Sequence, residues 1–480
     1  MQTRRDFLCT TFTSTAAVLA ASAFPSSLFA QQKPNVLFIA VDDLNDWIGC
    51  LGGHPDSVTP NLDRLASRST LFTRAYCNAP ACNPSRGSLV TGKLPTTTGV
   101  YENAHSFRQQ DPDAVTLMQH FMGNGYYVAG RGKITRQGRP ADVVSYHDYV
   151  PQGRDPLPPN PPLNGFSQGR FDWGPIDVSV EEMDDWKVVQ WGKEVLNKKH
   201  DKPFFLACGL YRPHLPWYVP RKYFDLYPPD EITLPNIDEN DLDDVPPIGR
   251  SFVTRRDDHK NVTETDNWRR AVAGYLACIR FADDMIGELL DALDNSSYAD
   301  NTMIVLWGDH GWHLGEKLHW RKFALWEEAT RVPLMISAPG MAPGRCDRTV
   351  SLVDLYPTFI DVCGLPQRDG LDGVSLKYLM EQPDREWDRP ALTTHIRGNH
   401  SVRSERWRYI RYSDGTEELY DHENDSLEWT NLAGDAQYKD IIDAHAAWIP
   451  KVEAPTAEPL RRQYGLSDGQ SLSKPGENPS

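Results

Sequence analysis

The chain is organised around the stretch Ala81-Cys82-Asn83-Pro84-Ser85-Arg86-Gly87-Ser88-Leu89-Val90-Thr91-Gly92, which predicts a reactive residue on a turn that runs into a helix. Pro84 suits the first helical turn, because the N–H that proline lacks has no partner there. A helix start favours negative charge in front of it, and Arg86 adds a forked cation suited to a tetrahedral oxyanion. The stretch therefore predicts an anion-attracting corner in which the Cys82 thiol is easily deprotonated. A buried cysteine before an ordinary helix is the alternative.

The run Cys82-Asn83-Pro84-Ser85-Arg86, with the following Thr91-Gly92, resembles the signature of the sulfatase family without interruption. In that family the cysteine is converted to formylglycine. The resemblance therefore implies that Cys82 becomes formylglycine, that a formylglycine-generating enzyme acts on the chain, and that the fold is alkaline-phosphatase-like. It extends over residues 34–366, with a looser match beyond, and within the family the chain is most similar to the iduronate-2-sulfatases.

Composition restricts the classes of partner. A chain of 480 residues can bury a large core, and its net charge of −16 argues against nonspecific binding to nucleic acid or to a membrane. An anionic substrate stays compatible with this charge, because a local cationic pocket can override the global field. The eight cysteines contain no CxxC pair, so no disulfide framework is indicated, although one or two bridges stay open.

The N-terminus, residues 1–30, predicts an export signal. Thr3-Arg4-Arg5-Asp6-Phe7-Leu8 is a twin-arginine pattern, and the mildly apolar run 14–23 that follows is too short to span a bilayer. That length disfavours the alternative of a helical membrane anchor. We therefore expect the twin-arginine export machinery as a partner, a periplasmic or secreted location in a bacterium, and no membrane span.

Adjacent carboxylates follow a predicted buried strand over residues 35–41. Asp42 and Asp43 are costly side by side unless a cation neutralises them, and their oxygens suit Ca²⁺ or Mg²⁺. A solvated turn with a helix cap is the alternative. Asp309 and His310 follow another strand over residues 302–307. The resemblance implies that Asp42, Asp43, Asp309 and His310, together with residue 82, hold a metal, with Ca²⁺ the usual ion and Mg²⁺ also compatible.

Basic residues end further strands. Lys133 ends a predicted strand over residues 125–133, and His214 follows a strand over residues 204–210. Taken singly, each would usually be a surface lysine or a structural histidine. The resemblance implies that Arg86, Lys133, His214 and Lys322 bind the sulfate and transfer protons. It also implies that hydrated formylglycine attacks the sulfur and later expels sulfate.

One departure from the family pattern concerns the residues after Lys133. Sulfatases usually carry a histidine two or three residues further on, where this chain has Thr135 and Arg136. Arg136 stays charged, so it cannot serve as a neutral base, but it can bind a second anionic group of the substrate. We therefore expect a substrate with a second negative charge near the ester, and assistance from His105 or His147 in sulfate release.

Strands that alternate with helices, with polar residues at the strand ends, predict a mixed α/β sheet sandwiched by helices. Helices are predicted over residues 180–198, 268–293 and 352–363, an irregular insertion over 135–175, and an acidic surface segment over 225–265. A hairpin of residues 400–412 and 417–421 around Asp414-Gly415 indicates a smaller C-terminal subdomain with an antiparallel sheet. The expected division is signal peptide 1–30, catalytic domain 31–390, C-terminal subdomain 391–455 and polar tail 456–480.

These observations together predict an exported sulfatase that acts on a sulfated sugar or polysaccharide, with iduronate 2-sulfate the best single candidate. Three alternatives stay open. One is a sulfatase of another glycan specificity, and another is a phosphonate or phosphodiester hydrolase, since the same nucleophile and metal serve there. The last is a non-catalytic binder of sulfated glycans, in which Cys82 stays unmodified.

Overall fold

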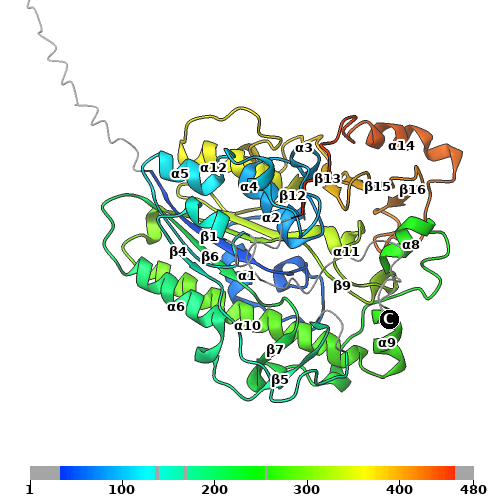
Figure 1. Cartoon of the computed structure of the whole chain (residues 1–480), viewed down its shortest axis with the longest axis horizontal. Coiled ribbons are helices and arrows are strands. Elements are labelled where there is room, and N and C mark those ends of the chain that lie inside the picture. The colour runs from blue at the N-terminus through cyan, green and yellow to red at the C-terminus, as the bar shows by residue number, and fades with distance from the viewer. Residues whose placement is uncertain (1–32, 136–139, 167–169, 254–256, 460–480) are drawn as a thin grey trace, which may run out of the picture. The chain divides into compact units, whose positions relative to one another are not determined.

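A central sheet of eight strands runs through the molecule (Figure 1). The structure is a computed structural model that describes residues 33–135, 140–166, 170–253 and 257–459. Every neighbouring pair in the sheet is parallel except the two pairs that β11 makes with β2 and β8. From edge to edge the strands are β12 (Gly344–Ser351), β2 (Thr70–Tyr76), β11 (Arg331–Ser337), β8 (Thr302–Gly308), β1 (Asn35–Val41), β6 (Phe204–Leu210), β3 (Tyr127–Gly132) and β4 (Asp148–Pro151).

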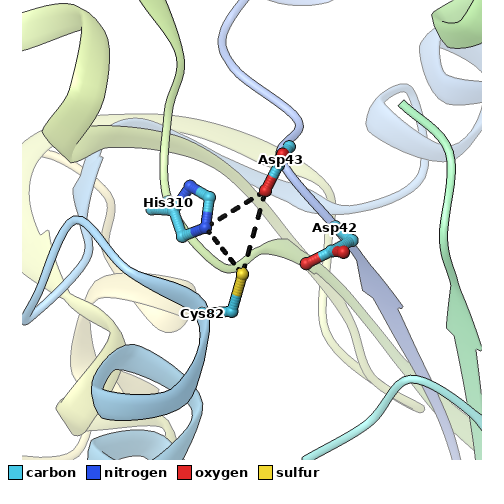
Figure 2. Close-up of side chains that lie close together, drawn as sticks. All are labelled: Asp42, Asp43, Cys82 and His310. Carbon is cyan, nitrogen blue, oxygen red and sulfur yellow. Dashed lines mark hydrogen bonds and ion pairs between the residues drawn. The ribbon is translucent and has the colours of Figure 1, made fainter. Parts of the chain in front are cut away.

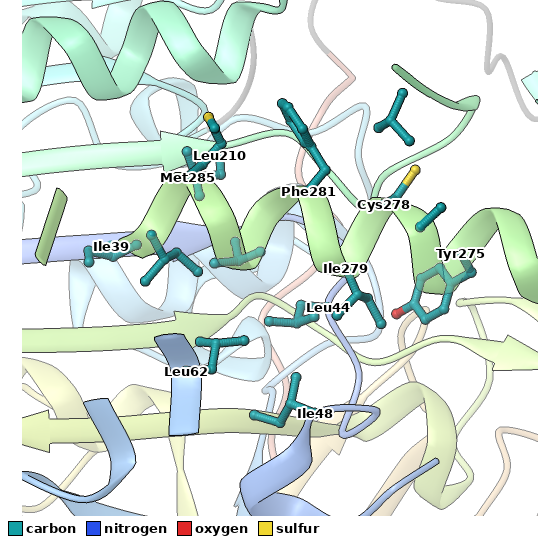
Figure 3. Close-up of a cluster of buried hydrophobic side chains, with 14 of the residues drawn as sticks. Ile39, Leu44, Ile48, Leu62, Leu210, Tyr275, Cys278, Ile279, Phe281 and Met285 are labelled. Carbon is teal, nitrogen blue, oxygen red and sulfur yellow. The ribbon is translucent and has the colours of Figure 1, made fainter. Parts of the chain in front are cut away.

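Helices cover both faces of this sheet, which is why its central strands are apolar throughout. Along β1, Leu37 and Ile39 point into one hydrophobic core, whereas Val36 and Phe38 point into the other. Figure 3 shows the first core, where Ile39 lies beside the long helix α10 (Trp268–Asp294). The mixed sheet between helical layers that the sequence predicts is confirmed.

Helix α10 shows why the amphipathic pattern predicted it over residues 268–293. Tyr275, Ile279 and Ile286 recur on one face and are buried against the sheet and its neighbours. The other helices of the described chain are α1 (Pro60–Ala66), α2 (Cys82–Thr91), α3 (Pro95–Thr98), α4 (Phe107–Gln110), α5 (Leu117–Gly123), α6 (Asp184–Leu196), α7 (Arg221–Phe224), α8 (Pro247–Val253), α9 (Asp258–Glu264), α11 (Glu327–Thr330), α12 (Leu355–Cys363), α13 (Lys377–Glu381) and α14 (Lys439–Ala446).

The polarity of the sheet brings distant residues together. Strands β8, β1, β6 and β3 are parallel neighbours, and the register pairs Val41 with both Gly308 and Leu210. Their carboxyl ends therefore meet at one edge, where open α/β sheets place ligands. Asp42, Asp309 and Lys133 come directly after three of these strands. The fold thus brings together Asp42, Lys133 and Asp309, which are far apart in the sequence.

The C-terminal part contains a four-stranded antiparallel sheet, as predicted. Its strands are β13 (Ala391–Thr394), β14 (His400–Arg403), β15 (Trp407–Arg411) and β16 (Glu417–Asp421). The hairpin around Asp414-Gly415 is present between β15 and β16. The stretch 400–412, predicted as one strand, is two strands separated by a turn in which the Ser404 hydroxyl and backbone bond to Trp407.

Two segments contain regular structure that the sequence did not predict: the insertion 135–175, predicted as irregular, and the segment 225–265, predicted as an acidic surface segment. The insertion 135–175 supplies β4 to the edge of the main sheet, and β5 (Trp173–Ile176) pairs with β7 (Trp217–Pro220) in a small parallel sheet. The acidic segment 225–265 holds α8 and α9. Both segments are rich in proline and polar residues, which mask short elements in the sequence pattern. A short hairpin, β9 (His313–Leu314) and β10 (Trp320–Arg321), completes the list of strands.

Several predictions lie outside the described residues. These are the signal peptide, Arg136, and the tail beyond residue 459. The domain boundaries stay a prediction. Within the described residues, no helix combines the length and apolarity needed to cross a bilayer. The seven cysteines there are all unpaired, so neither of the disulfides left open by the sequence forms among them.

Candidate active site

Helix α2 presents Cys82 as its first residue, because Ala81 before it is still extended, with φ of −158° and ψ of 140°. The backbone N–H of Asn83 donates to Asn103 Oδ1 over 3.0 Å, and the Asn83 amide donates to two carbonyls of the loop 102–105. This loop therefore fixes the turn at the helix start. Every residue of α2 is buried, so the helix has no solvent face.

Two lysines and a histidine surround the Cys82 sulfur. The Nζ atoms of Lys322 and Lys133 lie 2.9 and 3.5 Å from Sγ, and His310 Nε2 lies 3.3 Å from it. Figure 2 shows His310 and Asp43 pointing toward the sulfur, with Asp43 Oδ1 at 3.9 Å. Both lysines are buried. Two buried ammonium groups at one atom form a cradle for an anionic ester.

The protonation state of Cys82 differs from the prediction. Burial raises the pKa of the thiol above its ordinary value and Asp42 raises it further, whereas Lys133 and Lys322 act in the opposite direction. The prediction of an easily deprotonated thiol is therefore wrong, because desolvation outweighs the nearby cations. A protonated thiol is a weak nucleophile, so this corner does not by itself make a reactive cysteine.

Arg86 lies behind the carboxylates. It is fully buried, its Nε donates to Asp309 Oδ2 over 2.8 Å, and its Nη2 donates to Asp42 Oδ1 over 3.1 Å. Its Nη1 donates to the carbonyls of Lys133 and Ile134. Each of its three nitrogens thus has an acceptor within the protein. In this geometry Arg86 orients the carboxylates of Asp42 and Asp309. The sequence predicted that Arg86 would contact the sulfate directly.

Asp43 is the least satisfied carboxylate of the site. Its Oδ1 accepts from Lys322 Nζ over 2.7 Å, but its buried Oδ2 has no hydrogen-bond donor. Burial raises the pKa of Asp43 to about 7, although Lys322 acts to lower it. A buried carboxylate in this condition is costly, and a cation beside it would remove the cost. The sequence prediction of a cation at this point therefore has a physical basis in the structure.

Four side chains could hold that cation, with ligand atoms within 4.8 Å of one another: Asp42, Asp43, Cys82 and His310. His310 Nδ1 lies 3.0 Å from the Gly311 carbonyl, so it carries the proton and leaves the Nε2 lone pair facing Asp43 Oδ1 at 3.2 Å. Burial lowers the pKa of His310, which keeps it neutral as a ligand must be. These donors fit a divalent cation. Asp309, also predicted as a ligand, is not among these four side chains: its Oδ2 accepts from Arg86 and lies 3.6 Å from His310 Nε2, and its Oδ1 accepts from the Asp43 backbone. Its part in holding the ion stays a prediction.

His214 faces the same site from the end of β6. Its Nδ1 lies 2.7 Å from the Leu215 carbonyl, and its Nε2 lies 3.8 Å from Asp43 Oδ2. The ring stacks on Tyr211, and Arg212 holds the His214 carbonyl over 2.8 Å. Burial lowers the pKa of His214 well below its ordinary value, and Lys133 lowers it further. The imidazole is therefore neutral and fixed, with Nε2 available to the site.

His105 or His147 was predicted to assist sulfate release. His147 Nδ1 accepts from the Val128 N–H at the start of β3, the end opposite Lys133, so His147 is far from the site. His105 lies nearer, in the loop that fixes Asn83, but its Nδ1 accepts from the backbone of that loop. The structure therefore gives His147 no part in the chemistry and shows His105 in a structural contact.

The loop that carries Lys322 depends on residues that the sequence pattern did not single out. Lys317, with φ of 57°, pairs with Asp241 over 2.7 Å, and Arg321, with φ of 80°, pairs with Asp258. All four side chains are nearly or fully buried. Both acidic partners come from the segment 225–265. Only their charge was visible in the sequence, because their partners lie more than 60 residues away.

Asp241→Asn is expected to lower the free energy of unfolding by about 3 kcal/mol, because it leaves the Lys317 ammonium buried without its counter-ion. Urea unfolding followed by fluorescence measures this. The double variant Asp241→Leu with Lys317→Met removes both charges and should recover most of the loss. A double variant no more stable than the single one would show that the pair does not hold this loop.

Comparisons with known proteins place the chain in one family. The sulfatase family profile matches residues 34–365, and the profile described as N-sulphoglucosamine sulphohydrolase, C-terminal, matches residues 308–453. A sulfatase from Formosa agariphila is 39% identical over 442 residues, which are 88% of this chain and 87% of that protein. Choline-sulfatase from Rhizobium meliloti is 32% identical over 84% of this chain and 82% of that protein. Iduronate 2-sulfatase from Mus musculus is 32% identical over 69% of each chain.

A solved structure shows the same fold. Phosphonate monoester hydrolase from Silicibacter pomeroyi superposes with a TM-score of 0.74 at 22% identity, over 86% of this chain and 94% of that one. At this identity the likeness concerns the fold alone. The family profile covers most of the chain and includes the strand ends, helix α2 and the loop of Lys322. The chain therefore belongs to the sulfatase family, within the alkaline phosphatase superfamily.

Proposed function

We propose that this sulfatase hydrolyses the sulfate ester of a saccharide, and that iduronate 2-sulfate is the first substrate to test. One observation carries the proposal: two buried ammonium groups, of Lys322 and Lys133, lie at the position from which a nucleophile on residue 82 would act. The relatives named iduronate 2-sulfatase support the specific substrate. The choline-sulfatase relative makes choline sulfate the necessary comparison.

The chemistry follows from the charges that surround residue 82. A hydrated formylglycine at this position would supply a nucleophilic oxygen, and a divalent cation, which Asp42, Asp43 and His310 would hold, would supply positive charge beside it. Lys133 and Lys322 bind the oxygens of the ester and stabilise the negative charge that grows in the transition state. A formylglycine-generating enzyme is therefore a necessary partner.

His214 is the group that we assign to the proton of the leaving alcohol. Its Nδ1 is committed to the Leu215 carbonyl, so Nε2 exchanges the proton. Burial, and after it the charges of Lys133 and Lys322, lower the pKa of His214 and keep the imidazole neutral in the free site. An anionic ester bound between them offsets their charge and raises the pKa of His214, so that Nε2 can take up a proton and pass it to the leaving oxygen.

Two of the alternatives are separated by one assay. The protein, made with a formylglycine-generating enzyme, is given an aryl sulfate and the matching aryl phosphonate, and kcat/KM is compared. A preference for the sulfate supports the proposal, and a preference for the phosphonate assigns the chain to the other chemistry. A 2-O-sulfated iduronate disaccharide and choline sulfate are then compared in the same way. Glycan binding without turnover of any ester would identify a binder.

Export through the twin-arginine pathway also belongs to the proposal. It rests on the sequence of residues 1–30, which contain Arg4 and Arg5. Fractionation of a bacterial host that expresses the whole chain tests it. Sulfatase activity in the periplasm or medium, lost when both arginines become lysine, is the supporting result.

Arg136→Ala is expected to lower kcat/KM for a substrate with a second negative charge by about 10- to 100-fold, the loss of one charged hydrogen bond. The loss in kcat/KM for an aryl sulfate that carries no charge besides its ester should stay within about twofold. Arg154→Ala, which removes another arginine of the same insertion, is the control. Equal losses on both substrates would show that Arg136 does not bind a second charge.

A further inference from the structure

Three aromatic side chains from separate parts of the chain pack in a row that begins at Phe323, the residue after Lys322. Phe323 follows β10, His395 lies in the turn between β13 and β14, and Phe252 belongs to α8. The His395 ring centre lies 4.9 Å from that of Phe252, in an edge-to-face arrangement, and 6.0 Å from that of Phe323. His395 is buried between two partly exposed phenylalanines. We call these three residues the aromatic wall.

Phe323 is the member of the aromatic wall that is connected to the nucleophile, through Lys322 and through Pro80. Lys322 Nζ lies 5.8 Å from the Phe323 ring centre and 2.9 Å from the Cys82 sulfur. The Phe323 N–H donates to the Pro80 carbonyl over 3.1 Å, two residues before the nucleophile. The ring is therefore attached to the same short segment as the nucleophile and borders the same ammonium group.

The C-terminal sheet is also hydrogen-bonded to the residues just before Cys82. The Thr394 N–H donates to the Asn78 carbonyl over 2.9 Å, and the Thr393 hydroxyl bonds to the Cys77 carbonyl. These bonds place His395, the next residue, beside the catalytic loop. The loop of Lys322 and the C-terminal sheet thus both contribute side chains to the aromatic wall.

The backbone of Phe323 is unusual. Its φ of 73° lies in the left-handed region, which is costly for a bulky residue and persists only where the surroundings impose it. Arg321 has φ of 80°, and its pairing with Asp258 holds the same turn. The loop therefore turns the Phe323 ring toward Lys322 at a conformational cost. A merely space-filling phenylalanine does not require such a backbone.

We propose that the aromatic wall is a subsite that packs against the apolar face of the sugar ring carrying the ester. This rests on the proposed saccharide substrate. An occupant of this corner must be anionic at the end held by Lys322 and Lys133 and must present a flat, apolar surface beside them. The C–H face of a pyranose bearing a sulfate meets both requirements, and ligand sites in proteins commonly combine aromatic side chains with a few placed charges.

Phe323→Leu tests this, because leucine keeps apolar volume but loses the flat ring, whereas Phe323→Tyr keeps the ring. For the sulfated disaccharide, we expect KM to rise about tenfold in Phe323→Leu and to stay within about twofold in Phe323→Tyr. The inhibition constant of inorganic sulfate, which occupies only the lysine cradle, should be unchanged in both. Phe224→Leu, in α7, is the matched control for loss of a partly buried phenylalanine ring.

Three outcomes would overturn the subsite. An unchanged KM in Phe323→Leu would show that the wall does not contact the sugar. A parallel rise in the sulfate inhibition constant would show that the variant displaced Lys322. An equal rise in KM for an aryl sulfate would show that the aromatic wall binds any flat group and does not recognise the sugar. If the protein without substitutions cleaves aryl sulfates but no sulfated saccharide, the proposed saccharide substrate itself is wrong. That result is distinct from the three outcomes above.

Discussion

Cys82→Ala is expected to lower kcat by more than about 10⁴-fold and to leave the fold intact. The large loss follows because every mechanism available to this site acts through residue 82, and removal of a covalent nucleophile has a cost of this order. The fold should survive, because the Cys82 sulfur contacts two lysines and a histidine of the site and belongs to neither hydrophobic core. Steady-state kinetics on an aryl sulfate and thermal unfolding measure both effects.

The control for this variant is Cys50→Ala, which removes a partly exposed, unpaired cysteine that is not part of the group around Cys82. It should retain full activity. Substantial turnover by Cys82→Ala would mean that another group attacks the ester, because no second cysteine lies in the group around His310. A large fall in melting temperature would instead mean that Cys82 supports the fold.

Removal of the divalent cation is the second change with a large expected effect. Asp42, Asp43 and Asp309 converge, and the Asp43 Oδ2 atom is buried without a donor. At cation concentrations of about 100 to 1,000 times Kd, bound metal stabilises a fold by about 3 to 4 kcal/mol. Chelation should therefore lower the melting temperature and reduce kcat/KM by more than about 10³-fold, because the charge beside the nucleophile is lost.

Restoring Ca²⁺ or Mg²⁺ separately, with metal analysis, identifies the ion. The stabilisation by metal should grow as pH rises through about 7, since Asp43 must lose its proton to bind the ion. Asp43→Asn should abolish most of the stabilisation. Melting and turnover that are both indifferent to chelation would show that these carboxylates serve only the lysines and Arg86.

The sequence predicted the parts of the site that follow directly from strand ends. Asp42, Lys133 and His310 each stand at or just beyond the carboxyl end of a short apolar run, and parallel strands bring such ends together. The amphipathic pattern likewise predicted α10 to within one residue. These features depend on local patterns, which is why a single sequence was sufficient for them.

What the sequence could not predict depends on burial and on contacts between distant loops. Arg86 was expected on the sulfate, but it is buried against Asp42 and Asp309, and a motif does not show which side of a guanidinium is covered. The pKa of Cys82 was expected to fall, but it rises, because desolvation is a property of the assembled site. The aromatic wall unites three segments with no shared pattern, so only the folded chain reveals Phe323 beside Lys322.

The most direct test of the central claim is peptide mass spectrometry of the segment that contains Cys82, on protein whose specific activity is measured in the same preparation. Preparations made with increasing amounts of a formylglycine-generating enzyme supply a series. The account predicts the mass loss of cysteine-to-formylglycine conversion at position 82, with sulfatase activity proportional to the converted fraction. Full activity in protein whose Cys82 is an unmodified thiol would contradict it.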